Sequence, residues 1–129
     1  MGFIHVTVRL RPNRRSRRKY EAKFLVDSGA MDCLAPASKL KKAGFKREGR
    51  MAYELADGTI TELNFGLAVI EFMGDITAGR VIFGPEDCER LLGVTALESV
   101  GMVIDPATQR LKRLPAVPLK SIGNWPPRH

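Results

Sequence analysis

Short segments in which apolar and polar residues alternate make up most of the chain, and this is the pattern of half-buried β-strands. Apolar residues recur with period two from Ile4 to Leu10, and a second strand is predicted from Tyr20 to Val26. Turn-forming residues separate these two runs. The sequence therefore predicts an N-terminal hairpin whose loop, residues 11–19, is rich in basic residues.

A second hairpin is predicted in the middle of the chain. Tyr53–Leu55 and Thr59–Phe65 are strand-like and are separated by Ala56-Asp57-Gly58. An Asp-Gly pair between two such runs favours a tight turn with a positive φ angle. The second arm continues to Met73, and Gly66 within it indicates a bulge or a bend.

Two short helices are expected between the strands. Pro36 can occupy the first turn of a helix over Pro36–Ala43, and Gly44 is placed to end it. Thr95 is predicted to be the N-cap of the second helix, with Glu98 three residues later completing a capping box. Gly101 is expected to end that helix.

Further strands are predicted at Arg80–Phe83, Met102–Ile104 and Arg110–Leu114. The pattern thus favours an all-β domain of about eight strands and two short helices. Residues 115–129 contain four prolines and show no regular period, so we expect a flexible tail after the domain.

The charge of the chain is strongly segregated. The 129 residues include 21 basic and 14 acidic side chains, for a net charge of +7, and 44% are hydrophobic, as in a globular domain. Residues 1–19 hold seven bases and no acid, and residues 110–129 hold five bases and no acid. The middle of the chain, with nine bases and 14 acids, sums to −5. A chain that is basic by count is thus a mildly acidic domain with basic ends.

Composition also excludes several classes of protein. No apolar stretch is long enough to cross a membrane, and the alternating segment Met1–Leu10 is not a signal peptide. Cys33 and Cys88 form no disulfide framework, and His5 and His129 have no metal-ligand spacing. We expect a cytoplasmic protein with no metal and no organic cofactor. Cys33 is interpreted as a small buried residue, since no histidine partner is in reach by sequence.

The clearest chemical signal is a carboxylate delivered by an apolar strand. Phe24-Leu25-Val26 runs directly into Asp27-Ser28-Gly29-Ala30. An acid at the end of a buried strand is costly unless it is paired or hydrogen-bonded. Taken alone, Asp-Ser-Gly is a common tripeptide, and an aspartate that caps an ordinary turn is the simpler interpretation.

Three segments, taken in order, resemble the retropepsin-like aspartic protease family, and in particular its small bacterial members. Leu25–Ala30 is similar to the catalytic loop, and Leu55–Thr59 to the tip of the flap hairpin. Leu91-Leu92-Gly93, followed by the predicted helix Thr95–Val100 and by Gly101–Pro106, is similar to the apolar-apolar-Gly motif with its helix and closing strand. The resemblance implies a closed, mainly antiparallel β-barrel of the retropepsin type over residues 1–114, with the flap at about 51–63.

The resemblance also implies a catalytic mechanism. Asp27 would be the catalytic carboxylate, and Ser28, Gly29 and Ala30 would support its loop. Aspartic proteolysis uses two carboxylates that share one proton, and this chain has one Asp-Ser-Gly. A complete site therefore requires a symmetric homodimer, which would hydrolyse peptide bonds of a peptide or protein substrate.

Further roles follow from the same resemblance. Retroviral members often carry two acids after the alanine; here Asp32 matches the second, and Met31 replaces the first. The expected structural support beneath the loop is Leu91, Leu92 and Gly93. The expected substrate-binding residues are Asp32 and the flap tip, comprising Ala56, Asp57, Gly58 and Thr59.

The basic run from Arg9 to Lys19 leaves a second function open. It could bind nucleic acid or an acidic partner, or attract an acidic substrate, but aromatic residues are not interleaved with the arginines. A solvated loop is the interpretation we favour for a lone run of this kind. The alternative to an endopeptidase is a catalytically silent module with the same fold, binding peptide or nucleic acid through the flap groove or residues 9–19.

Overall fold

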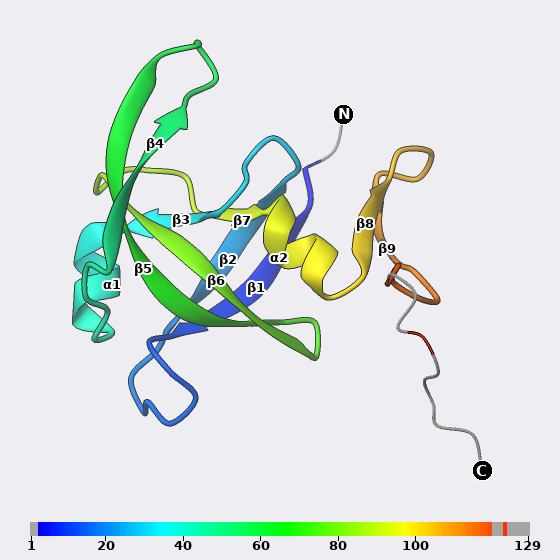
Figure 1. Cartoon of the computed structure of the whole chain (residues 1–129), viewed down its shortest axis with the longest axis horizontal. Helices are drawn as coiled ribbons and strands as arrows, with labels where there is room; N and C mark the ends of the chain where they lie inside the picture. Colours follow the sequence, from blue (N-terminus) through cyan, green and yellow to red (C-terminus); the bar gives the residue numbers. More distant parts are fainter. Residues whose placement is uncertain (1–2, 120–122, 124–129) are drawn as a thin grey trace.

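Six strands form a closed barrel in the computed structural model, which describes residues 3–119 and 123 (Figure 1). Each strand pairs with the next, and the last pairs with the first. In order around the barrel they are β1 (His5–Arg11), β2 (Tyr20–Asp27), β7 (Leu91–Gly93), β3 (Cys33–Pro36), β6 (Asp75–Gly84) and β5 (Ile60–Phe72).

Most of the pairings in this barrel are antiparallel. The exceptions are β2 with β7 and β3 with β6, which run parallel. The predicted closed, mainly antiparallel barrel is therefore confirmed. Strand β3 was not predicted, because its four residues end in Pro36 and show no alternation long enough to recognise.

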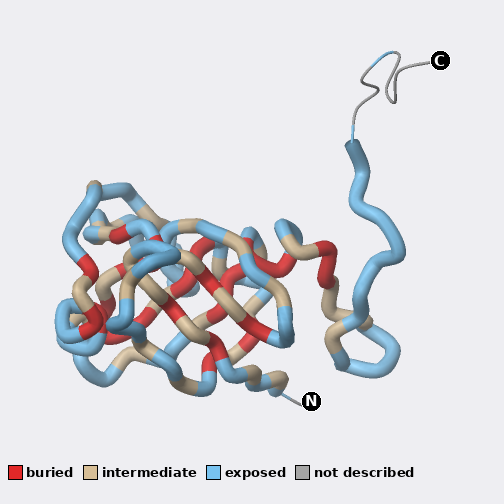
Figure 2. Tube along the Cα trace, turned by 90° about the horizontal axis from the view of Figure 1, so that it is seen from below, coloured by how far each residue is buried: buried red, intermediate tan, exposed pale blue. Residues whose placement is uncertain are grey.

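The core lies inside the barrel, where the inward-facing residues of each strand meet. Buried positions alternate with half-buried ones along much of the barrel strands, as Figure 2 shows. Large side chains in the core each contribute about 1.5–3 kcal/mol by leaving water. Those without measurable exposure include Val8, Leu10, Phe24, Val81, Leu92 and, from the first helix, Leu40.

The central hairpin projects beyond the barrel (Figure 1). Strand β4 (Gly49–Glu54) pairs with β5 and begins four residues before its predicted start. The Leu55 carbonyl accepts a hydrogen bond from the Gly58 amide at 2.9 Å, and the Leu55 amide donates to Thr59 at 2.7 Å. Gly58 has a φ angle of +86°, so the predicted turn at Asp57-Gly58 is confirmed.

The helices differ from their predictions in how they begin. Helix α1 (Ala37–Lys42) has Pro36 as its N-cap, so Pro36 precedes the helix rather than lying in its first turn as predicted. Gly44 follows this helix with a φ angle of +94°, as predicted. Helix α2 (Val94–Ser99) has Gly93 as its N-cap and no side-chain cap hydrogen bond. The predicted capping box is therefore wrong, because Thr95 lies inside the helix rather than at its start.

No bulge occurs at Gly66. The register between β5 and β6 is continuous from Phe65 to Phe72. Near Gly66, the other edge of β5 passes from pairing with β4 to pairing with β1. Gly66 is also a point of close approach, since a Cβ atom there would lie 3.0 Å from the carbonyl oxygen of Lys46.

A separate two-stranded sheet follows the barrel. It consists of β8 (Met102–Asp105) and β9 (Arg110–Arg113), and both Figures 1 and 2 show it standing to one side. Residues 115–119 are exposed and carry no helix or strand. The rest of the expected flexible tail, apart from residue 123, lies outside the described residues. Neither α1 nor α2 has the length and apolar character that a membrane-crossing helix needs.

Candidate functional site

Asp27 is the last residue of β2, at the point where that strand leaves the barrel. It pairs with Gly93 of the parallel strand β7 and is half-buried. One carboxylate oxygen, Oδ1, accepts a hydrogen bond from the Gly29 amide at 2.9 Å. The Ala30 amide donates to the Asp27 carbonyl at 3.2 Å, which closes the turn. The Asp-Ser-Gly segment thus forms a compact loop with the carboxylate hydrogen-bonded inside it.

The start of α2 holds this loop from the other side. The Val94 amide donates to the Ala30 carbonyl at 2.8 Å, and the Thr95 amide donates to the Met31 carbonyl at 3.2 Å. Gly93 lies so close beneath the loop that a Cβ atom would come within 2.6 Å of the Met31 and Asp32 backbone. The structure therefore places Leu91, Leu92 and Gly93 directly against β2 and its loop.

Asp32 connects the loop to the central hairpin, β4 and β5, which is the predicted flap. Its side chain is 9% exposed, and Oδ2 accepts a hydrogen bond from the Tyr53 hydroxyl of β4 at 2.7 Å. Burial raises the pKa of Tyr53, and its hydrogen bond to the Asp32 carboxylate raises it further. Sequence reasoning missed Tyr53; its one signal is that it is the aromatic residue of the segment Gly49–Glu54.

The flap tip is open to solvent. The Thr59 amide donates to the Asp57 carboxylate at 2.9 Å, and this hydrogen bond lowers the pKa of Asp57. Ala56 to Thr59 are all exposed, and Leu55 and Ile60 beside them are 43% and 70% exposed. Among residues 3–119 and 123, no hydrogen bond joins the tip to the loop of Asp27.

The cysteines lack the properties of a nucleophile. Cys33 is 1% exposed, and burial raises the pKa of its thiol to about 11. Burial also raises the pKa of Cys88, and both cysteines are free. The prediction that Cys33 is a small buried residue is confirmed. In the described part of the chain, no three His, Cys, Asp or Glu side chains come together as metal ligands would.

A cavity of about 640 Å³ opens beside the aspartate. Asp27 and Ser28 form part of its wall, and most of the remainder is apolar. The apolar part combines the N-terminal segment with α2 and β8, and includes Phe3, Ile4, Leu25, Leu97, Met102 and Ile104. The carboxylate is therefore accessible from a large apolar recess.

Comparison with solved structures identifies the architecture. The chain is similar to the crystal structure of the retroviral protease-like domain of Ddi1 from Leishmania major, with a TM-score of 0.54 and 18% sequence identity. The match covers 88% of this chain and 89% of that one. The fold is retropepsin-like. No protein-family model and no curated protein sequence matches the chain.

Within this retropepsin-like fold, the predicted site residues fall into two groups. Asp27, Ser28, Gly29, Ala30 and Asp32 lie in one loop that is anchored by β7 and α2. Residues 56–59 lie at the end of the flap hairpin, which reaches that loop through Tyr53 and Asp32. The loop of Asp27, the central hairpin and strand β7 are thus connected within one chain.

Proposed function

We propose that the protein is an aspartic endopeptidase that acts as a homodimer. Asp27 of each subunit would supply one of the two catalytic carboxylates. The observation that carries the proposal is the placement of Asp27: it ends a barrel strand, lies in a loop held by backbone hydrogen bonds, and lines an open recess.

The anchoring of the loop supports a catalytic role. A carboxylate that must exchange a proton with water and substrate needs a fixed position. Asp27 is held through Oδ1 and Gly29, and its loop is held through the amides of Val94 and Thr95. None of these contacts neutralises the carboxylate with a cation.

The apolar recess supports the dimer. It lies beside Asp27, and Phe3 in its wall is 74% exposed. Small domains gain stability from burying such surface against a partner. A second copy related by a two-fold axis would cover the recess and would place Asp27 of the partner subunit next to the first.

In the proposed reaction, the two Asp27 carboxylates carry out the proton transfers. Two Asp27 carboxylates within hydrogen-bonding distance of each other would share one proton. The ionised Asp27 would take a proton from water as the water oxygen attacks the carbonyl carbon, while the protonated Asp27 of the partner subunit would donate to the carbonyl oxygen. The C–N bond of the resulting diol would then break, as the first Asp27 gives its proton to the leaving nitrogen and the partner's Asp27 takes one back from a diol hydroxyl.

The flap would close over the peptide and exclude water, and Ala56 to Thr59 would contact its main chain. Asp32, which was expected to bind substrate, is 9% exposed and hydrogen-bonded to Tyr53, so it would hold the flap in place instead.

We also propose a cytoplasmic location. Both cysteines are free, as is usual in a reducing compartment.

The test is cleavage of a fluorogenic peptide mixture across acidic to neutral pH, with sedimentation at the same concentrations. Asp27→Asn should lower cleavage by about 100-fold or more, since it removes the acid–base group, and should leave the dimer intact. Asp87→Asn makes the same change at an exposed acid outside the site and should cleave normally. Equal cleavage by Asp27→Asn and wild type, or cleavage by a strict monomer, would contradict the proposal.

A further inference from the structure

Two basic segments that are far apart in the sequence meet on one side of the barrel (Figure 1). One is the loop between β1 and β2, and the other runs from α1 into the chain after it. The guanidinium of Arg18 lies against Gly44, at the end of α1, where a Cβ atom would come within 2.9 Å of it. We call their ten cations the basic face: Arg14, Arg15, Arg17, Arg18, Lys19, Lys39, Lys41, Lys42, Lys46 and Arg47.

The two segments of the basic face contain no acidic residues that could neutralise its charge. All ten side chains are exposed, and residues 12–19 and 37–47 contain no acid. Because the whole chain carries +7, the rest of it sums to −3. The ion pairs of the described residues use other cations, namely Arg9, Arg11, Arg50 and Arg113. Two acids lie beside the basic face: Glu48 directly follows Arg47, and the Glu86 carboxylate accepts a hydrogen bond from the Ser38 hydroxyl of α1. Neither forms an ion pair among the described residues.

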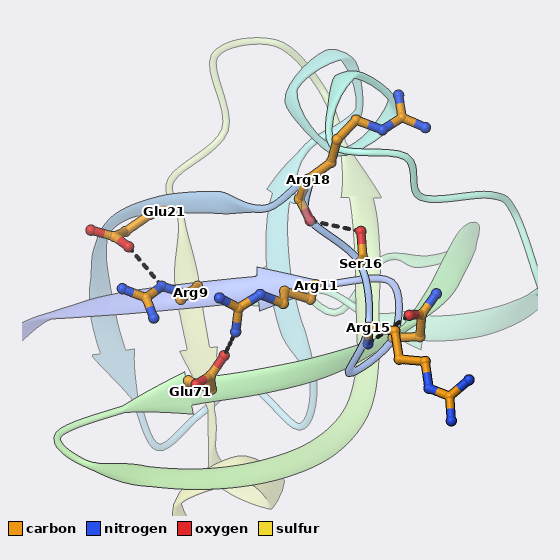
Figure 3. Close-up of polar contacts among 8 residues, drawn as sticks. Arg9, Arg11, Arg15, Ser16, Arg18, Glu21 and Glu71 are labelled. Atoms are coloured by element: carbon orange, nitrogen blue, oxygen red, sulfur yellow. Dashed lines mark hydrogen bonds and ion pairs between the residues drawn. The ribbon is translucent and has the colours of Figure 1, made fainter.

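The arginine loop is ordered rather than loose (Figure 3). The Arg15 amide donates to the Asn13 side chain at 2.9 Å, and the Ser16 hydroxyl donates to the Arg18 carbonyl at 2.9 Å. At its base, Arg9 pairs with Glu21 and Arg11 with Glu71, so these two acids are already engaged. A loop held in this way loses less conformational entropy when it binds a ligand.

The basic face has no apolar anchor. The large hydrophobic side chains exposed in the described residues all lie outside segments 12–19 and 37–47. Protein interfaces have an apolar core, and membrane-binding surfaces insert apolar side chains into the lipid. A partner of this face must therefore be recognised by dense negative charge alone.

We propose that the basic face binds the phosphate backbone of double-stranded nucleic acid without sequence preference. Duplex DNA carries one phosphate charge per about 1.7 Å of axis, far denser than the charge along an extended acidic peptide. The face supplies five arginines and five lysines, and a single guanidinium group can donate two parallel hydrogen bonds to one phosphate. The structure has no exposed aromatic residue within the two segments for stacking on single-stranded bases.

This inference does not depend on protease activity. The arginine loop precedes β2 and Asp27 ends it, so the two are separated by the length of that strand, about 23 Å at 3.3 Å per residue. A cavity of about 420 Å³ beside the loop is a weaker candidate for an anion site, because Glu21, Glu71 and Asp75 form part of its wall.

The test is binding of a fluorescent duplex of arbitrary sequence, about 20 base pairs long, over a range of salt concentrations. Three triple variants with the same change in charge are compared, and circular dichroism checks that each is folded. The loop variant carries Arg14→Ala, Arg15→Ala and Arg17→Ala. The α1 variant carries Lys41→Ala, Lys42→Ala and Lys46→Ala, and the control carries Lys23→Ala, Arg110→Ala and Lys112→Ala.

The loop and α1 variants should each weaken binding by about tenfold or more, and each should lower the slope of log Kd against log salt by about 2–3, as expected for three lost phosphate contacts. The control should stay close to wild type. The proposal is overturned if the loop and α1 variants match the control, or if salt does not weaken binding. It is also overturned if polyglutamate competes as well as the duplex does, because the face would then be a site for acidic proteins.

Discussion

Replacing Tyr53 with phenylalanine should loosen the flap and leave the barrel intact. The substitution removes a single hydroxyl, which donates to the Asp32 carboxylate at 2.7 Å. Asp32 is 9% exposed, so water replaces this hydrogen bond poorly. A hydrogen bond to a charged group contributes about 1.5–3 kcal/mol, and the loss of its donor leaves a nearly buried oxygen without that partner.

The effect should be local because of how the hairpin is attached. Strand β4 has β5 as its partner in the sheet, and the Tyr53–Asp32 hydrogen bond ties it to the loop of Asp27. A loss of about 1.5–3 kcal/mol corresponds to a roughly 10–150-fold rise in the open population. Amide hydrogen exchange over residues 49–60 should speed up by that factor, while exchange in β1 and β2 should not change.

Tyr20→Phe provides a matched control for this experiment. Tyr20 is also half-buried, and its ring packs near Phe24 with 6.1 Å between centroids. The same atom is removed, but the change lies at the opposite end of β2 from the loop. Asp32→Asn should have a smaller effect than Tyr53→Phe, because its amide oxygen can still accept from Tyr53. If Tyr53→Phe and Tyr20→Phe give the same flap exchange, the reasoning is refuted.

Two further results are expected from other parts of the structure. Gly93→Ala should lower the free energy of unfolding in urea by about 3 kcal/mol or more, because its Cβ atom would lie 2.6 Å from backbone atoms. Gly79→Ala is the control, since its Cβ atom would meet only a side chain at 3.6 Å and should be tolerated. Equal losses of stability in the two variants would contradict this. Burial raises the pKa of the Cys33 thiol from 9.0 to about 11, so the folded state holds this proton more tightly than the unfolded state. The free energy of unfolding should therefore be highest below pH 9 and fall by about 2–3 kcal/mol as the pH rises to 11. If the free energy of unfolding of a Cys33→Ala variant falls equally steeply with pH, another group is responsible.

The local turn chemistry of the chain could be predicted from its sequence. Asp57-Gly58 predicted the turn of the central hairpin, and Gly44 and Gly101 predicted where the two helices end; all three glycines have a positive φ angle. Each depends on a backbone angle that glycine adopts readily, so the signal is contained in one or two residues. The alternating segment from Ile4 to Leu10 was equally informative, because one of its faces lies in the core.

The elements that escaped prediction owe their form to distant neighbours. Strand β3 has four residues and β7 has three, and each is set by parallel pairing with a strand far away in sequence. The same pairing places Gly93 at the start of α2, which is why the expected cap at Thr95 failed. The partner of Asp32 could not be predicted either, since 21 residues separate it from Tyr53.

Closure of the barrel limits where this molecule can add another strand. Each of the six barrel strands has a neighbour on both sides along part of its length. Among the described strands, β4 and the β8–β9 pair keep a free edge along their whole length. The barrel strands keep shorter free edges, such as Tyr20–Phe24 of β2 and Ile60–Asn64 of β5, where one partner strand has ended. An extended peptide, or a strand from a second copy, finds its longest unpaired edges on β4 and on the final hairpin. Closure of the barrel thus favours β-sheet association at these two elements over association at the barrel wall.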